Sequence, residues 1–179
     1  MLYGKHVRLC AVECTHLPNY VRWFNDPEVR RYLAWDRPMS SGDEERWFES
    51  ISDTSTDFRF AIEAGGSAVE NWSHIGSVGL ENIDWQSRCA TLGIMIGDKE
   101  YWGQGYGTDS VWTMLRFGFE TLNLHRVQLD VYDFNTRAIR CYERVGFQRE
   151  GTKRQALFRD GRYHDVFLMS VLSDEFLQG

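Results

Sequence analysis

Hydrophobic and polar positions alternate along four stretches of the chain, a pattern typical of strands that bury one face. The apolar positions are Val7, Leu9 and Ala11; Phe58, Phe60 and Ile62; Ala90, Leu92, Ile94 and Ile96; and Val127, Leu129 and Val131. A further strand is predicted in HIGSVGLENI, after a polar turn around AGGSAVEN (64–71). We expect the three strands between residues 58 and 97 to form an antiparallel meander.

Other stretches have helical spacing instead. Residues 16–35 place Tyr20, Trp23 and Phe24 on one face, and Asp26-Pro27 is a plausible cap before a second turn of helix. Further helices are predicted over Ser40–Ile51, from about Thr108 to Leu122, and from Asn135 to a C-cap at Gly146. FQREG and RYHDVFLMSVL then form two strands joined near Asp160-Gly161. The order β-α-α-β-β-β-α-β-α-β-β predicts an α+β fold, with a mixed, mostly antiparallel sheet flanked by helices.

Composition narrows the class of protein. The 179 residues, 42% hydrophobic and 15% aromatic, suit one globular domain spanning 1–179. No stretch approaches the ~20 apolar residues that cross a bilayer, and the N-terminal MLYGKHVRLC lacks a signal-peptide core. The four cysteines form no Cys-x-x-Cys pair. We therefore expect a cytoplasmic protein without a metal site, disulfides or a membrane partner.

The formal charge of −6 bears on the partners. It gives no electrostatic attraction to nucleic acid. It favours a cationic partner such as an amine, although such acidity also serves solubility alone.

Three glycines on alternate positions, in YWGQGYGTDS (101–110), precede the predicted third helix. Glycine allows close approach of a ligand to the main chain, and a helix N-terminus attracts anions such as phosphate. The spacing is not that of a Walker loop, because no Gly-Lys-Ser/Thr follows, nor of a dinucleotide fingerprint, because Thr108 stands where the third glycine belongs. The loop can still direct several N–H groups at a diphosphate, or it can simply shape a tight turn.

Three motifs in this order resemble the GNAT superfamily of acyl-CoA-dependent N-acyltransferases, over nearly the whole chain. They are GIMIGDKEYWGQGYGTDS (93–110), NTRAIRCYERVGF (135–147) and RDGRYHDVFLMSVL (159–172). Together with NDPEVRRYL (25–33), they are most similar to the RimJ/RimL-type branch, the acetyltransferases of ribosomal-protein N-termini. The resemblance implies acetyl-CoA as co-substrate and no metal.

The resemblance also implies a cofactor site. Ile94–Ile96 would pair with the pantetheine arm, the loop from Gly103 to Thr108 would hold the pyrophosphate, and Asn135 would lie near the cofactor besides capping its helix. The family usually has Arg or Gln where this chain has Trp102, with Gln104 two places later, so backbone N–H groups carry the expected phosphate contacts. The expected cofactor-binding residues are Ile94, Met95, Ile96, Trp102, Gly103, Gln104, Gly105, Tyr106, Gly107, Thr108, Asn135, Ala138 and Tyr142.

The chemistry requires a neutral amine, a stabilised oxyanion and a proton for the leaving thiolate. By resemblance, Tyr142 is the general acid; the alternative is a core tyrosine. Relatives often carry a glutamate base where this chain has Thr91. Glu81 is therefore the candidate base, followed by Asp84, His164 and Asp165, with water as the alternative route. Trp35 and residues 33–40 would wall the acceptor pocket, and Asp84 and His164 are further candidates for acceptor contacts.

Two functions from different classes fit these residues. The first is an acetyl-CoA-dependent N-acetyltransferase that acts by direct attack on the thioester, with a small-molecule amine or a protein N-terminus as acceptor. The second is a non-catalytic acyl-CoA-binding sensor or interaction module, favoured by the missing glutamate at position 91. A monomer and a homodimer both remain open.

Overall fold

The computed structural model describes residues 1–51, 56–65 and 71–177. These residues form one eight-stranded sheet with the order β1-β2-β3-β4-β5-β6-β8-β7. The strands are β1 (Leu2–Tyr3), β2 (Val7–Cys10), β3 (Phe58–Ala64), β4 (Ser73–Asp84), β5 (Cys89–Ile96), β6 (Arg126–Tyr132), β7 (Gln148–Arg159) and β8 (Arg162–Leu172). Only β5 and β6 pair in parallel among these strands; all other neighbours are antiparallel. The predicted α+β class, with a mixed and mostly antiparallel sheet, is confirmed.

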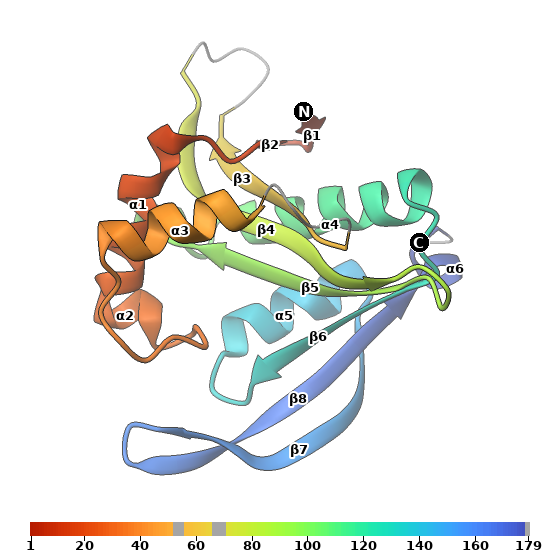
Figure 1. Ribbon diagram of the computed structural model, residues 1–179. Coiled ribbons are helices and arrows are strands. Elements are labelled where there is room, and N and C mark those ends of the chain that lie inside the picture. The colour runs from red at the N-terminus through yellow and green to blue at the C-terminus, as the bar shows by residue number, and fades with distance from the viewer. Residues whose placement is uncertain (52–55, 66–70, 178–179) are drawn as a thin grey trace.

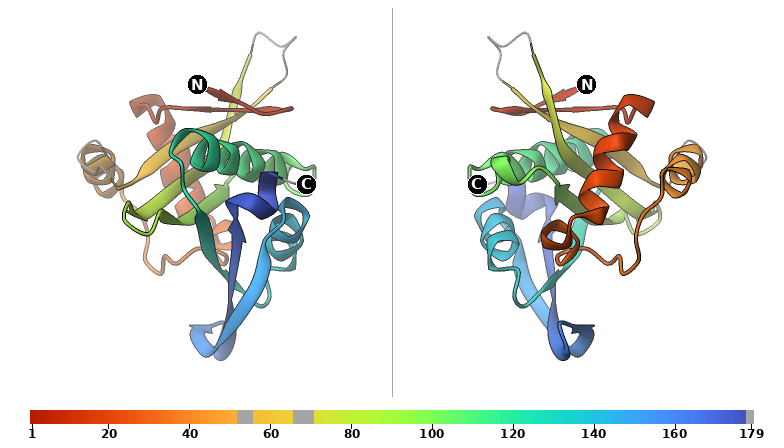
Figure 2. Two further views of the ribbon diagram at one scale, coloured as in Figure 1. Left: turned by 90° about the vertical axis from the view of Figure 1, so that its right-hand side faces the viewer. Right: turned by 90° about the vertical axis from the view of Figure 1, so that its left-hand side faces the viewer.

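Helices cover both faces of the sheet (Figures 1 and 2). The helical segments are η1 (Cys14–His16), α1 (Leu17–Asn25), α2 (Pro27–Arg30), α3 (Ser41–Ile51), η2 (Lys99–Tyr101), α4 (Tyr106–Arg116), the π-helical turn η3 (Phe117–Thr121), α5 (Thr136–Val145) and α6 (Ser173–Leu177). Helices α4 and α5 pack on one face with the larger apolar core, and α1 and α2 pack on the other around Met95. None of the described helices is long and apolar enough to cross a membrane.

The third predicted helix differs from the structure at both ends. It begins at Tyr106 rather than near Thr108, because Gly105 at the N-cap takes a left-handed φ of 92°. Beyond Arg116 the chain continues as the wider turn η3, closed by a hydrogen bond from Leu122 N–H to the Phe117 carbonyl. Apolar spacing alone does not distinguish a π-helical turn from a regular α-helical turn.

The last hairpin is longer than the sequence predicted. FQREG marked a short strand, but β7 runs for 12 residues with register shifts after Arg149 and Lys153. Most of its side chains are exposed, so it lacks the alternation that marks a strand. The predicted turn at AGGSAVEN falls largely on residues 66–70, outside the described residues; the strands that flank it pair antiparallel, as expected.

The sheet opens between its two parallel strands. β5 and β6 pair only at Cys89–Arg126, Ala90–Val127 and Thr91–Gln128. Beyond these pairs the two strands diverge, as Figure 1 shows, and most of their remaining residues line a cavity. This divergence positions the site described next.

Candidate active site

A cavity of about 810 Å³ occupies the divergence of β5 and β6. Its walls come from several parts of the chain: the N-terminal helices α1 and α3, strand β4, the ends of β5 and β6, the glycine loop before α4, helix α5 and the β7–β8 hairpin. Segments from residue 12 to residue 166 therefore meet around one space.

The C-terminal half of β5 presents an edge to this cavity that no strand pairs with, although the Ile96 carbonyl accepts a hydrogen bond from Trp102. Ile94, Met95 and Ile96 pair with β4 on one side only, since β6 has diverged on the other. All three line the cavity, as predicted for the cofactor arm. An extended chain with amide groups can hydrogen-bond to such an exposed strand edge.

The glycine loop closes one end of the cavity. Gly103 and Gly105 have φ values of 75° and 92°, and a Cβ at either position would meet nothing within 4 Å. Their requirement for glycine is therefore conformational rather than steric. The first N–H groups of α4, from Tyr106 to Thr108, have no acceptor within the helix, so this end of the cavity suits an anion.

Some residues of the glycine loop line the cavity, and others contact neighbouring parts of the chain instead. Gly103, Gly105, Gly107 and Thr108 line the cavity. Gln104 and Tyr106, also expected among the cofactor-binding residues, do not line it. The Gln104 amide donates to the Glu100 carbonyl, and the Tyr106 ring packs on Tyr101 at 5.2 Å between centroids.

Trp102 and Arg137 form a stacked pair at the mouth of the loop. The Trp102 indole N–H donates to the Ile96 carbonyl at 2.6 Å, which fixes the ring. The Arg137 guanidinium lies 3.7 Å from the centroid of that ring and 5.4 Å from the Tyr32 ring. Both residues line the cavity, and Arg137 forms no ion pair with any described residue. The sequence reading missed Arg137, although its place two residues after Asn135 put it at the start of the predicted helix.

Helix α5 places Asn135, Ala138 and Tyr142 on the cavity wall. Asn135 is the N-cap, and its Oδ1 accepts a hydrogen bond from Ala138 N–H at 3.3 Å. Tyr142 is buried, at 7% exposure, and its hydroxyl forms no hydrogen bond with the described residues. Burial raises the pKa of this hydroxyl above its usual value, so it carries its proton at neutral pH and can donate to a bound group.

Opposite α5, strands β4 and β5 form the floor beneath the N-terminal helices. Register pairs Ser77 with Met95, Gly79 with Gly93, and Glu81 with Thr91, so these side chains share one face. A Cβ at Gly93 would meet nothing within 4 Å, which leaves open space between the Ser77 and Glu81 pairs.

Glu81 lines the cavity but is already engaged. Its Oε1 accepts from Arg59 Nε at 2.9 Å, and Arg59 also contacts Asp57 at 3.0 Å. Only Oε2 remains for an acceptor or a water. The facing Thr91 has no ionisable group, as the sequence indicated.

The structure places three predicted acceptor contacts outside the cavity lining. The Asp84 carboxylate caps the turn between β4 and β5 through the N–H groups of Gln86 and Ser87. His164 is 5% exposed and bonds to Asp133 at 3.0 Å. Trp35 packs on Phe24 instead. Each side chain serves a local structural contact that spacing along the chain does not reveal.

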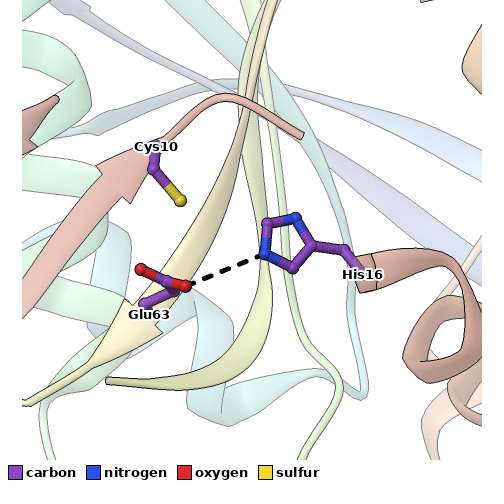
Figure 3. Close-up of side chains that lie close together, drawn as sticks. All are labelled: Cys10, His16 and Glu63. Atoms are coloured by element: carbon purple, nitrogen blue, oxygen red, sulfur yellow. Dashed lines mark ion pairs between the residues drawn. The ribbon is translucent and has the colours of Figure 1, made fainter. Parts of the chain in front are cut away.

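A separate cluster of possible metal ligands lies where β2, β3 and η1 meet: Cys10, His16 and Glu63 (Figure 3). His16 Nδ1 accepts from Glu13 N–H, so Nε2 carries the proton and faces Glu63 Oε1 at 3.7 Å. Glu63 is paired with Arg8, and burial followed by the Glu63 charge raises the pKa of the Cys10 thiol to about 11. A metal needs a thiolate and an unprotonated ring nitrogen. Here the thiol and the ring nitrogen that faces Glu63 both carry protons, and the Glu63 carboxylate is already paired with Arg8.

Fold and cavity together define an acyl-CoA-dependent N-acyltransferase. Residues 6–148 match the family model described as an acetyltransferase (GNAT) domain. The chain is 33% identical over 155 residues to the spermidine N(1)-acetyltransferase of Vibrio cholerae, which covers 87% of this chain and 80% of that protein. It is 28% identical to the uncharacterized N-acetyltransferase p20 of Bacillus licheniformis over 98% of this chain and 97% of p20.

The crystal structure of spermidine N-acetyltransferase from Vibrio cholerae in complex with CoA and spermine is similar throughout. Its TM-score is 0.86 at 29% identity, over 96% of this chain and 98% of that one. The chain belongs to the GNAT acetyltransferases and is an acetyl-CoA-dependent N-acetyltransferase. Its cavity fits coenzyme A, because a one-sided strand edge meets a loop with free N–H groups.

Proposed function

We propose that this enzyme acetylates a primary amine of a small aliphatic polyamine. The observation that carries the proposal is the hydroxyl of Tyr142, protonated, unpartnered and set in the cavity wall. The similar enzyme from Vibrio cholerae is named for spermidine, and its crystal structure contains CoA and spermine. The net charge of −6 also favours a cationic acceptor.

The assignment of cofactor contacts follows the cavity lining. Bound acetyl-CoA supplies the activated acetyl group. Ile94–Ile96 hold an extended amide chain along the free edge of β5, and Gly103, Gly105 and the start of α4 hold the diphosphate through main-chain N–H groups. Arg137, stacked on Trp102, supplies the cationic side chain that the loop itself lacks.

The reacting groups meet above Gly79 and Gly93, where both strands lack side chains. The acceptor amine approaches from the side of α1 and α3, and Tyr142 donates its proton toward the leaving sulfur from the side of α5. Desolvation raises the pKa of the coenzyme A thiol as it raises that of the Tyr142 hydroxyl, so the two pKa values stay close in the closed site. Glu81 Oε2, or a water next to it, accepts the proton that the amine must lose.

The proposal also covers the domain organisation, the position of the acceptor contacts and the cellular compartment. We propose that residues 1–179 act as one domain and that the acceptor contacts lie at the floor of β4 and β5 rather than at Trp35, Asp84 and His164. The four cysteines are free thiols, which fits a reducing compartment such as the cytoplasm. The resemblance of the sequence motifs to the RimJ/RimL-type branch makes a protein N-terminus the competing acceptor.

Release of free thiol from acetyl-CoA, measured across a panel of amines, tests the proposal. The panel holds spermidine, 1,4-diaminobutane, amino sugars, amino acids and short peptides with varied N-termini. Turnover of the polyamines above slow hydrolysis is the expected result. Turnover of peptides alone would replace the acceptor. If no amine of the panel increases thiol release, while acetyl-CoA still raises the melting temperature, the result would favour the non-catalytic binding module.

A further inference from the structure

Two residues beside the cavity bury polar side chains that form no hydrogen bond with the described residues. Tyr20 on α1 is 1% exposed, and its hydroxyl has no hydrogen-bond partner among the described residues. Glu44 on α3 is 2% exposed and forms no ion pair or hydrogen bond with the described residues. Buried polar groups in native proteins are nearly always bonded, so each exception needs an explanation.

Glu44 differs from the other sequestered acids that the structure describes. Glu63 is paired with Arg8, and Asp57 with Arg59. The Asp109 carboxylate accepts from the backbone N–H groups of residues 5, 6 and 7. For Glu44, burial without such support raises its pKa to about 7. A carboxylate is expensive to bury alone, and a cationic ligand is one way to compensate it.

The two groups lie together. Burial raises the pKa of the Tyr20 hydroxyl and the charge of nearby Glu44 raises it further, while Ser77 partly offsets both. Trp47, three positions after Glu44 on α3, packs its ring on Tyr20 with centroids 5.6 Å apart. Tyr20, Trp47 and Ser77 all line the cavity. The Glu44 carboxyl is therefore near enough to this aromatic wall to act electrostatically on the Tyr20 hydroxyl.

We propose that Tyr20, Trp47 and Glu44 form a subsite for a second, positively charged nitrogen of the acceptor. The Tyr20 oxygen accepts a hydrogen bond from the ammonium, the Trp47 face lies beside it, and the Glu44 carboxylate neutralises it from behind. This inference rests on the proposed function and extends it: the enzyme selects acceptors that carry two cationic nitrogens rather than one.

Strand geometry sets the spacing that the subsite selects. Tyr20 lies over Ser77 and Met95, one register pair beyond Gly79 and Gly93, where we place the reacting amine. Two residues of strand span roughly 7 Å. Acceptors with two nitrogens separated by about four methylene groups or more therefore reach both places.

The test compares 1,4-diaminobutane with n-butylamine, which has the same carbon chain and one nitrogen fewer. Wild-type kcat/KM, followed as thiol release, is expected to favour the diamine on the order of tenfold, the value of one charge-assisted contact. Glu44→Gln keeps the size and removes the charge, so the preference is expected to fall to near one, through KM rather than kcat. The matched control is Glu45→Gln at the exposed neighbouring position, which keeps the wild-type preference.

A second variant guards against a loss of structure. Tyr20→Phe keeps the ring packing and removes the orphaned hydroxyl, so it is also expected to reduce the preference, with melting temperatures confirming that each variant is folded. Equal kcat/KM values of the wild type for the two amines, or an unchanged preference in Glu44→Gln, would overturn the subsite while leaving the acetyltransferase activity established.

If neither amine is acetylated, the proposed acceptor is wrong. Calorimetric binding of 1,4-diaminobutane then decides the subsite: binding by wild type and loss of binding by Glu44→Gln supports it, and any other result overturns it.

Discussion

The side of the cavity that we assign to the cofactor presents main-chain groups at the end of β5 and in the glycine loop. The side that we assign to the acceptor presents side chains from α1, α3 and β4. On the cofactor side, the positive φ values of Gly103 and Gly105 set the geometry. On the acceptor side, the free polar groups belong to Tyr20 and Glu44, whose burial depends on how helices pack. Backbone recognition tolerates many side-chain replacements, while acceptor recognition changes with single residues. One fold can thus keep its acetyl donor and vary its acceptor.

The largest expected effect is at Tyr142, where a substitution should change kcat without changing the affinity for CoA. Tyr142→Phe keeps the ring contact with Phe147 and removes the hydroxyl. Because a positioned acid contributes about 100-fold or more, we expect kcat to fall by that factor, with CoA affinity unchanged. Thiol-release kinetics and calorimetry measure the two quantities. Tyr163→Phe, at an exposed tyrosine of the β7–β8 hairpin, is the control. An unchanged kcat would remove Tyr142 from the mechanism.

The acceptor side should also reveal itself in stability. Burial raises the pKa of Glu44 from 4.5 to about 7, so the folded chain holds a proton that the unfolded chain releases above pH 4.5. The free energy of unfolding therefore decreases as pH rises from about 4.5 to 7, by about 3 kcal/mol in total. Glu44→Gln is expected to abolish this decrease and to raise the melting temperature at pH 8 but not at pH 4. Parallel pH profiles for the two proteins would show that the carboxyl is solvated.

A smaller effect is expected on the cofactor side at Arg137. Arg137→Ala removes the guanidinium stacked on Trp102 and is expected to raise KM for acetyl-CoA about tenfold. Acetyl-pantetheine, which has no phosphate, should react equally well with wild type and variant. Arg140→Ala makes the same charge change on α5 outside the cavity lining and serves as the control. Equal losses with both donors would mean that Arg137 acts by packing rather than by binding phosphate.

The sequence predicted the cofactor side far better than the acceptor side. The glycine spacing, the apolar period of β5 and the cap at Asn135 are local patterns, and the structure places all three segments on one cavity. The sequence did not predict a role for Arg137, because Trp102 lies 35 positions away in the chain and only the folded structure stacks the two side chains. Asp84 and His164 were chosen for chemistry, yet each is used in a turn or a buried hydrogen bond.

The acceptor contacts depend on long-range packing. Tyr20 and Trp47 carry the pattern of ordinary core aromatics, and Glu44 that of a solvated helix position. Only the approach of α3 to α1 buries the carboxyl, and no local spacing encodes that approach. The long strand β7 was missed for the opposite reason, because its exposed side chains hide the period of two.

The three register pairs that join β5 to β6 have a mechanical consequence. They connect a five-stranded half of the sheet to a three-stranded half, with little else in the sheet to resist their separation. An acetyl donor bound where β5 and β6 diverge would contact both halves of the sheet. Its binding would be measurable as an increase in the free energy of unfolding. At a concentration 100-fold above its Kd, such a ligand adds about 2.7 kcal/mol. The supply of acetyl donor would then regulate how long each molecule survives proteolysis as well as how fast it works.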